Sequence, residues 1–472
     1  MTAEVKPATS RRIGTILLGG GASGPAIEAW LSAEPHGVSD FAAARRACER
    51  FWGLSRDLVA SLPAKPGRSA GQTQAVEAVV ERARSARDAF LNAHVDAVYA
   101  ELTDKLSRFV RVEDLVLTAA DTFPGLTPSR ADLNREVGVL QRDKDALEID
   151  QGIFLAHVLG HEQSGRHLCH AMLRPLPESA ELLDRFLAEG ILDVGAARLE
   201  RCGPAVRLTA ANPRYLNAED ATTLRAMEAA VDVAILDPES KVVVLRGGEV
   251  DHPKYRGRRL FGSGINLTHL YRGDIPFTWF VQRDLGYVHK IFRGVSLGDA
   301  VIDDVHSDTA EKQWIGAVEG FAIGGHCQLL LVMDYTIAAS DAYMTLPAQK
   351  EGIIPGAANL RLARQVGEKL ARQLVQYQRR LDSDTPEGRR ICDEIVAPDA
   401  MDAAIETVVA NLTTSGAVGA LANRRAFRVG AEPLDIFRRY MAVYAREQAG
   451  CHFSPALIAN LERYWDAQNR QG

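Results

Sequence analysis

The residues whose types and spacing could do chemistry lie in three short segments between positions 260 and 356. The first runs from Leu260 to Leu267, and the second from Glu319 to Gln328. In the second segment a strand-like run ends in a Gly-Gly turn, Gly324 and Gly325, and a buried helix pattern begins. Backbone N–H groups exposed at such a helix start carry partial positive charge, which suits a developing oxyanion. The pattern predicts a place where negative charge on an oxygen is stabilised.

The other two segments add a backbone donor and a turn. In the first segment, Gly262 and Gly264 have no side chains, which leaves the backbone amide near Ile265 free to approach a ligand. The third segment, Leu346 to Gly356, ends in a Pro-Gly pair. This pair could shape an apolar pocket or be an ordinary turn.

Together the segments resemble the crotonase, or enoyl-CoA hydratase/isomerase, superfamily over roughly residues 204–400. The resemblance implies that the amides of Ile265 and Gly325 form an oxyanion hole that polarises the thioester carbonyl of an acyl-CoA. It places Asn217, in the Leu216-Asn217-Ala218 segment, near the CoA site. The other residues that it implies beside the acyl-CoA are Ser263, Gly264, Asn266, Leu267, Gly324, Ile354, Pro355, Gly356 and Ala357.

Two positions depart from the hydratases of this superfamily, which carry glutamates there. This chain has Gln328 three residues after Gly325, and Ala348 after the proline of the third segment. A glutamine can donate or accept a hydrogen bond but cannot take a proton as a carboxylate does. Water addition across a C=C bond is therefore disfavoured, whereas chemistry that begins with an enolate beside the thioester is retained.

These departures, a long helical N-terminal extension and the segment from His252 to Arg283 make the chain similar to the cofactor-independent dioxygenases of this superfamily. The similarity extends over essentially the whole chain. It implies conversion of 3,5-dihydroxyphenylacetyl-CoA and O2 to 3,5-dihydroxyphenylglyoxylate and CoA, without metal or flavin, in the formation of dihydroxyphenylglycine for vancomycin-type glycopeptide antibiotics. It also implies a cytoplasmic homotrimer or hexamer.

Two other functions stay open. The chain could catalyse another enolate reaction on an aryl-CoA, such as thioester hydrolysis or isomerisation. It could also be a catalytically inactive protein that binds CoA esters, because Gln328 and Ala348 are both neutral.

The resemblance implies further polar contacts to the substrate. Glu219 could accept a hydrogen bond from a phenol or thioester-side group, or could simply be a charge in the first turn of a helix. Arg283 could hold a phenol oxygen or form a surface ion pair. Gln328 could touch the reacting end or be a structural amide.

A basic stretch follows the first β-rich runs of the core. CoA carries phosphates, so positive charge here has a use, although a charge cluster is commonly just a solvated face. The stretch consists of His252, Pro253, Lys254 and Tyr255, followed by the basic group Arg256, Arg258 and Arg259.

These segments need an α/β scaffold to position them. β-rich runs alternate with helical patterns after about residue 200, which predicts a sheet with helical crossovers. The runs are Val206–Ala210, Val242–Leu245, Ile315–Val318 and Thr336–Ala339, and the helical patterns are Ala221–Val233 and Leu360–Leu374. We expect a helical N-terminal domain (1–200), a crotonase-like ββα spiral core (201–398) and a helical C-terminal portion (399–472). In the N-terminal domain, we expect about Phe41 to Leu192 to be helical, because the apolar residues from Gln74 to Leu102 recur at the spacing of one helix face.

The N-terminal part contains two weaker motifs. Gly19 to Gly24 satisfies GxGxxG after a possible strand, Thr15–Leu18, but no βαβ unit follows. We interpret it as a flexible glycine turn.

The second motif comprises four histidines and a cysteine without an HExxH sequence, and packing or pairing is a better interpretation than metal binding. Its members are His157, His161, His167, Cys169 and His170.

The composition excludes several classes of protein. The chain has 472 residues, a net charge of −6, 46% hydrophobic and 25% charged residues, which is typical of ordinary soluble domains. A mildly acidic net charge disfavours a nucleic-acid binder.

The sequence shows no targeting or membrane segment: we expect no signal peptide in residues 1–12 and no membrane span. Six widely spaced cysteines without a CxxC pair indicate reduced cytosolic thiols.

Overall fold

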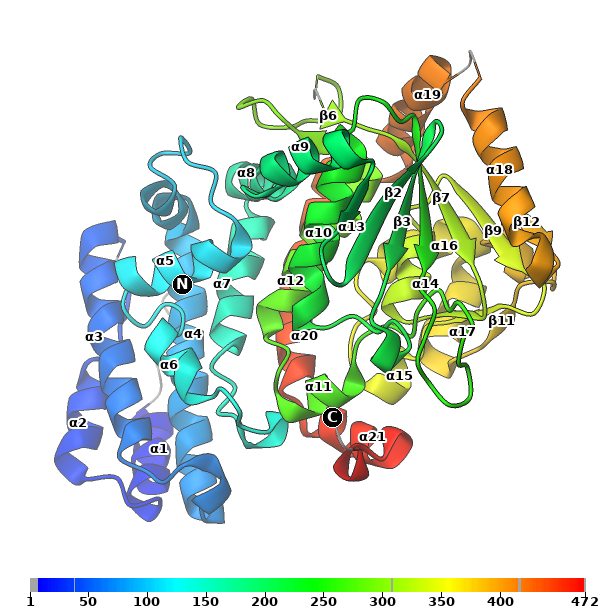
Figure 1. Cartoon of the computed structure of the whole chain (residues 1–472). Helices are drawn as coiled ribbons and strands as arrows, with labels where there is room; N and C mark the ends of the chain where they lie inside the picture. Colours follow the sequence, from blue (N-terminus) through cyan, green and yellow to red (C-terminus); the bar gives the residue numbers. More distant parts are fainter. Residues whose placement is uncertain (1–6, 38, 307–308, 415–416, 471–472) are drawn as a thin grey trace.

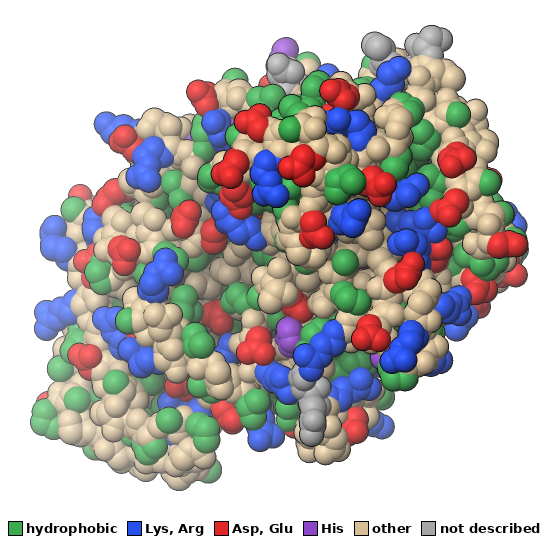
Figure 2. Space-filling view, in the orientation of Figure 1, with side chains coloured by type: hydrophobic (Ala, Val, Ile, Leu, Met, Phe, Trp, Pro, Cys, Tyr) green, Lys and Arg blue, Asp and Glu red, His purple; other side chains and the backbone are tan. Residues whose placement is uncertain are grey.

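The computed structural model describes residues 7–37, 39–306, 309–414 and 417–470. The first six residues, which are part of the segment where we expect no signal peptide, lie outside these ranges. A helical N-terminal domain lies beside an α/β core (Figure 1). Acidic and basic side chains are interspersed over the face shown in Figure 2. None of the helices in the described ranges is both long and apolar enough to cross a membrane.

The N-terminal domain is built around one long helix. This helix, α4, spans Ala70–Leu102 and buries the expected apolar face, including Val79, Phe90 and Val98. Ser69 caps it, with the Gln72 side chain bonded back to the cap, so its start is fixed by a capping box. The other helices are α1 (Pro7–Gly19), α2 (Gly24–Ser32), α3 (Phe41–Ala60), α5 (Val112–Thr122), α6 (Arg130–Arg135), α7 (Ile149–Gly160), α8 (Glu162–Leu173) and α9 (Ser179–Glu189).

The GxGxxG segment connects two helices. Thr15–Leu18, interpreted as a possible strand, lies inside α1, so that expectation is wrong. Its apolar residues recur at helical spacing, and Leu17 packs into the core. The predicted glycine turn is confirmed, since the backbone turns between α1 and α2 at Gly21, which has a φ of +94°.

The core contains a seven-stranded sheet in the order β1-β2-β3-β4-β7-β9-β12. β1 to β3 pair antiparallel, and the pairs from β3 to β12 are parallel. All four predicted strands are confirmed here. β4 is buried at every position, which explains its continuous apolar run. The strands are β1 (Ile191–Asp193), β2 (Ala197–Cys202), β3 (Ala205–Ala210), β4 (Val242–Gly247), β7 (Gln313–Val318), β9 (Tyr335–Ala339) and β12 (Glu394–Val396).

A smaller sheet, β11-β10-β8, carries the Gly-Gly turn. Its strands are β8 (Phe321–Ile323), β10 (Tyr343–Thr345) and β11 (Leu381–Asp382), and a separate pair is formed by β5 (Val295–Ser296) and β6 (Thr309–Ala310). The α/β fold class with helical flanks is therefore confirmed.

The helical pattern Leu360–Leu374 is divided between two helices, contrary to expectation. Gly367, with a φ of +83°, separates them because this backbone conformation ends a right-handed helix. The helices of the core are α10 (Ala221–Leu236), α11 (Leu267–Arg272), α12 (Phe277–Leu285), α13 (Tyr287–Arg293), α14 (Gly325–Leu330), α15 (Ala348–Glu351), α16 (Ala358–Val366) and α17 (Glu368–Tyr377).

The C-terminal helices pack against both other parts. They are α18 (Met401–Leu412), α19 (Ala417–Ala431), α20 (Leu434–His452) and α21 (Pro455–Trp465). On α20, Arg438 donates to the carbonyls of Leu159 and Gly160 at the end of α7, at 2.9 and 2.7 Å. α20 also packs on α12 of the core. The division of the chain at residues 200 and 398 stays a prediction, and the sheet itself begins at Ile191.

A buried charge network joins the N-terminal domain to the core. Lys290 on α13 is fully buried, and its Nζ lies 2.7 Å from both Glu228 and Asp232. Arg111, which precedes α5, donates to Glu228 at 2.9 Å. Two buried carboxylates therefore depend on these two cations, one from each part of the molecule.

Removing one cation from this network should destabilise the fold. We expect Lys290→Met to lower the free energy of unfolding by about 3–5 kcal/mol, because Glu228 and Asp232 lose their buried partner. Lys241→Met, at an exposed lysine, should cost less than about 1 kcal/mol. Thermal and urea unfolding would measure both. Equal shifts for the two variants would contradict this account.

Candidate active site

The first and second segments lie side by side at the end of β8. The Gly262 amide donates to the Phe321 carbonyl at 3.1 Å, and the Ile323 amide donates to Gly262 at 3.0 Å. At Gly264, which has a φ of +82°, a Cβ atom would come within 2.9 Å of the Ile323 oxygen and 3.2 Å of the Gly325 nitrogen. Glycine is required at residue 264 because this close approach leaves no room for a side chain.

This approach brings together two backbone donors. The carbonyl of Gly264 and the amide of Asn266 both bond the backbone of Glu219, at 2.7 Å each, which holds the chain on either side of Ile265. Among the hydrogen bonds of the described residues, the amides of Ile265 and Gly325 have no acceptor. Two unpaired N–H groups on adjacent segments can donate to a single ligand oxygen, which is what stabilisation of an oxyanion requires.

A buried ion pair lies directly under the Gly-Gly turn. Arg283 Nε donates to Glu219 Oε1 at 2.8 Å, and the Tyr287 hydroxyl donates to the same oxygen. A Cβ on Gly325 would come within 2.1 Å of Glu219 Oε2, an oxygen with no hydrogen-bond partner in the described part of the chain. Burial opposes ionisation of Glu219, but Arg283 outweighs it and lowers the pKa of this carboxyl below its usual value.

Arg283 also fixes the reacting side of the site. Its Nη2 donates to the carbonyl of Gly325 at 2.8 Å, and its Nη1 donates to Gln328 Oε1 at 3.0 Å. Since the oxygen of the Gln328 amide is engaged by a cation, its NH2 group is left to donate to a ligand. Of the alternatives for Arg283, the surface ion pair is wrong, because the side chain is only 3% exposed.

His326 is a member of the site that the sequence did not identify. Its Nδ1 accepts the Gly264 amide at 3.1 Å, and its ring lies against Gly262, where a Cβ would come within 2.2 Å of it. Burial lowers the pKa of His326 to about 4, although the Glu219 carboxylate opposes this effect. The imidazole is therefore neutral at pH 7 and fixes the Gly264 backbone. Its position next to the glycine pair was the available signal.

The third segment forms a wall beside Gln328. A Cβ on Gly356 would come within 2.4 Å of Gln328 Oε1 and 2.8 Å of Asp284 Oδ1. The Ala357 amide donates to Asp284 at 3.3 Å, and the Ile354 amide donates to Gln448 on α20 at 2.9 Å. Pro355 to Ala357 is buried, so this turn is packed against the reacting side of the site.

Several residues expected near the ligand hold the backbone. Asn217, 3% exposed, donates to the carbonyls of Gly248 and Leu260 at 2.8 Å each. Ser263 donates to the Tyr215 carbonyl at 3.1 Å. Asn266 caps α11 and donates to Asp220, and Leu267 begins that helix. These side chains position the loops that carry Glu219 and Ile265, and their contact with a ligand stays a prediction.

The basic stretch is less positive than its sequence indicates. Each of its arginines, Arg256, Arg258 and Arg259, has a carboxylate within 3.6 Å. Lys254 lies over the ring of Tyr255 at 4.9 Å, and Tyr255 packs edge-on against Phe321 of β8. The stretch therefore adjoins the strand that carries the Gly-Gly turn. Lys254, which follows His252 and Pro253, forms no ion pair with a carboxylate of the described residues.

The histidines of the N-terminal motif have protein partners. His157 Nε2 lies 2.8 Å from Asp88, His167 Nε2 lies 3.0 Å from the Leu106 carbonyl, and His170 Nε2 lies 3.1 Å from the Gly298 carbonyl. His161 precedes α8 and contacts Ser164. Within the described ranges, no group of three or more His, Cys, Asp or Glu side chains is placed to hold a metal ion.

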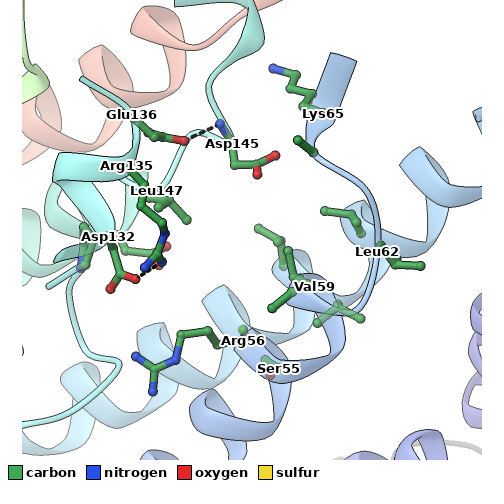
Figure 3. Close-up of a pocket in the computed structure, with 18 of the residues that line it drawn as sticks. Ser55, Arg56, Val59, Leu62, Lys65, Asp132, Arg135, Glu136, Asp145 and Leu147 are labelled. Carbon is green, nitrogen blue, oxygen red and sulfur yellow. Dashed lines mark hydrogen bonds and ion pairs between the residues drawn. The ribbon is translucent and has the colours of Figure 1, made fainter. Parts of the chain in front are cut away.

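A cavity of about 940 Å³ lies away from this site, inside the N-terminal domain. Val59 of α3 faces it from one side and Asp132 and Glu136 from the other (Figure 3). All of its lining residues lie between Trp52 and Asp150, so none of the residues around the Gly-Gly turn contributes to it.

Comparison with known proteins defines the class. The family model for enoyl-CoA hydratase/isomerase matches residues 305–433. A probable enoyl-CoA hydratase of Rhizobium meliloti (strain 1021) is 30% identical over 202 residues, which are 43% of this chain and 68% of the relative. The chain therefore belongs to the enoyl-CoA hydratase/isomerase family, and the resemblance inferred from its motifs is confirmed.

A more particular similarity covers most of the chain. The (3,5-dihydroxyphenyl)acetyl-CoA 1,2-dioxygenase of Amycolatopsis orientalis is 45% identical over 394 residues, which are 83% of this chain and 89% of the relative. Among solved structures, an enoyl-CoA hydratase/isomerase from Xanthobacter autotrophicus Py2 matches with a TM-score of 0.47 and 22% identity, covering 58% of this chain and 96% of that chain.

The ion pair under the Gly-Gly turn should make stability depend on pH. The pKa of Glu219 is lowered by folding, so its ionised form stabilises the protein above the ordinary value of 4.5, and this contribution is lost as the pH falls through the folded pKa. We expect Glu219→Gln to lower the free energy of unfolding by about 3–5 kcal/mol at pH 7, because Arg283 is left unpaired. The difference from wild type should shrink below pH 4.5.

Thermal unfolding from pH 7 to pH 3.5 would measure this effect. Glu249→Gln, which removes an exposed carboxylate from a surface pair, is the matched control and should change stability by less than about 1 kcal/mol. A constant difference between wild type and Glu219→Gln at all pH values would contradict the expected titration.

Proposed function

We propose that this chain is a dioxygenase that converts (3,5-dihydroxyphenyl)acetyl-CoA and O2 to 3,5-dihydroxyphenylglyoxylate and CoA. The observation that carries the proposal is the pair of acceptor-free amides, Ile265 and Gly325, beside a neutral Gln328. Such a site stabilises an enolate but offers no carboxylate at the two hydratase positions. The similarity to the Amycolatopsis orientalis dioxygenase supports the substrate and the reaction.

The first step is the formation of an enolate. An α-carbon between an aryl ring and a thioester is more acidic than that of a simple acyl-CoA, because both neighbours delocalise the negative charge. The amides of Ile265 and Gly325 donate to the thioester oxygen, and their hydrogen bonds strengthen as that oxygen becomes negative. Fixed backbone donors need no reorganisation at this moment, so the stabilisation is larger than water provides.

The enolate then supplies the electrons for O2. It transfers an electron to O2, and the resulting radicals combine into a peroxide at the α-carbon. The peroxide oxygen attacks the thioester carbonyl and expels CoA as a thiolate. Cleavage of the O–O bond, with loss of the second α-proton, gives the keto acid, which contains both atoms of O2. We propose that neither a metal nor a flavin takes part, since the substrate itself is the reductant.

The side chains under the turn complete the site. We propose that the NH2 group of Gln328 donates to the reacting end of the substrate, an orientation supported by the bond from Arg283 to its oxygen. Glu219 Oε2, which has no hydrogen-bond partner among the described residues, could accept a bond from a substrate hydroxyl. The turn Ile354–Ala357 forms one wall of the acyl pocket, and exclusion of water there limits competing hydrolysis.

The wider context is also proposed from the resemblance. Asn217 and the stretch from His252 to Tyr255 lie on the CoA side of the site, with Lys254 as a cation for its phosphates. The protein works as a cytoplasmic homotrimer or hexamer. Its keto acid is the precursor of dihydroxyphenylglycine in the biosynthesis of vancomycin-type glycopeptide antibiotics.

One experiment tests this function against its rivals. Chelator-treated protein is incubated with (3,5-dihydroxyphenyl)acetyl-CoA while O2 uptake, free thiol and the acid product are followed. We expect one O2 consumed for each CoA released, and two labelled oxygens in the keto acid when 18O2 is used. Release of CoA without O2 uptake would indicate a thioesterase. Tight binding without turnover would indicate a CoA-ester-binding protein.

A further inference from the structure

The proposed reaction needs a base for the α-proton, and the two hydratase positions do not provide one. Gln328 and Ala348 carry no carboxylate. Glu219 is ionised, but Oε1 is bonded by both Arg283 and Tyr287. Arg283 lowers the pKa of Glu219, which makes this carboxylate a poor proton acceptor even at Oε2, the oxygen without a hydrogen-bond partner among the described residues.

Glu351 brings a carboxylate to the same turn from the other side. It is the last residue of α15, three residues after Ala348, so the two side chains lie on one face of that helical turn. β10 precedes α15 and pairs with β8, which places α15 next to the Gly-Gly turn. A Cβ on Gly324 would lie 3.8 Å from Glu351 Oε1, so the carboxylate faces the residue that adjoins Gly325.

The environment of Glu351 differs from that of Glu219. Its side chain is buried, with the residue 9% exposed, and among the described residues its carboxylate has no ion pair and no hydrogen bond. Burial alone raises the pKa of Glu351 to about 7. Several charged and titratable groups on the elements around it have other partners. They are Lys350 on its own helix, Glu462, Arg463 and Tyr464 on α21, Glu368 and Arg372 on α17, and Glu219 and Arg283 under the turn. Lys369 and Tyr377 of α17 and His326 of α14 are further titratable groups on these helices, and none of their contacts in the described part of the chain is with Glu351.

The C-terminal helix α21 covers the short helix that carries this carboxylate. A Cβ on Gly352 would come within 3.2 Å of the Cα atom of Leu457, and Asn460 Nδ2 donates to the Gln349 carbonyl at 3.2 Å. α21 therefore packs closely on α15. A buried carboxylate with no cation beside it is a stronger base than one in solution.

We infer that Glu351 is the catalytic base that removes the α-proton of the acyl-CoA. In this step the α C–H bond breaks and its proton goes to a Glu351 oxygen. The electron pair of that bond moves into the C=C bond of the enolate, and the carbonyl electrons move to the oxygen held by Ile265 and Gly325. No oxidant is needed, so the step precedes and is separable from the reaction with O2. The inference rests on the proposed function for its substrate.

Exchange of the α-hydrogens tests the base without O2. The protein is incubated anaerobically with (3,5-dihydroxyphenyl)acetyl-CoA in D2O, and mass spectrometry follows deuterium at the α-carbon. We expect Glu351→Gln to exchange at least about 100-fold more slowly than wild type, which is the usual contribution of a general base. Glu351→Asp, which keeps a carboxylate, should retain measurable exchange. Glu368→Gln, an exposed glutamate on α17, is the control and should exchange like wild type.

The pH dependence gives a readout that a structural role would not produce. Because the base acts only when ionised, wild-type exchange should rise with pH and level off above about 7. Thermal unfolding of Glu351→Gln checks that the isosteric change leaves the fold intact.

Exchange at the wild-type rate in Glu351→Gln would overturn the inference. If wild type exchanges but takes up no O2, the dioxygenase proposal fails and the base stands. If wild type takes up O2 while Glu351→Gln still exchanges, only the base fails.

Discussion

The site depends on the buried ion pair between Glu219 and Arg283. Removing a carboxylate and a guanidinium from water costs several kcal/mol for each ion, and only close contact with further hydrogen bonds offsets that cost. Arg283 makes those contacts with Glu219, with Gln328 and with the carbonyl of Gly325. Glu219 in turn is bonded through its backbone to the residues on either side of Ile265. One ion pair therefore sets the relative positions of both backbone donors and of the side chain at the reacting end.

The two carboxylates of the site differ because their surroundings differ. Glu219 faces a guanidinium, which lowers its pKa, whereas Glu351 is buried without a cation, which raises its pKa to about 7. Environments that move two carboxyl groups apart in this way commonly give them different roles. Here one is a permanent charge that holds the site together, and the other is suited to exchange a proton near neutral pH. The neutral Gln328 accepts a bond from Arg283 and, lacking a carboxylate, does not compete for that proton.

The sequence predicted the elements whose local pattern is strong, and it missed contacts that depend on the fold. The strand at Val242–Leu245 was predictable because a parallel strand buried on both faces is a continuous apolar run. The break at Gly367 was not, because a glycine within a helical pattern does not reveal its backbone angle. The backbone donors were found through their glycines. His326 and Glu351 were missed because the burial of both, the bond from Gly264 to His326 and the lack of an ion pair at Glu351 among the described residues arise only when distant segments pack together.

The most direct test of this account is an anaerobic crystal structure with (3,5-dihydroxyphenyl)acetyl-CoA bound. We expect the thioester oxygen within about 2.7–3.2 Å of the backbone nitrogens of both Ile265 and Gly325, the range of an ordinary hydrogen bond. The Glu219–Arg283 pair should be intact beneath the turn, with the α-carbon facing Glu351. A thioester oxygen bonded to other groups, with either amide left unpaired, would contradict the central claim that these two donors stabilise the enolate.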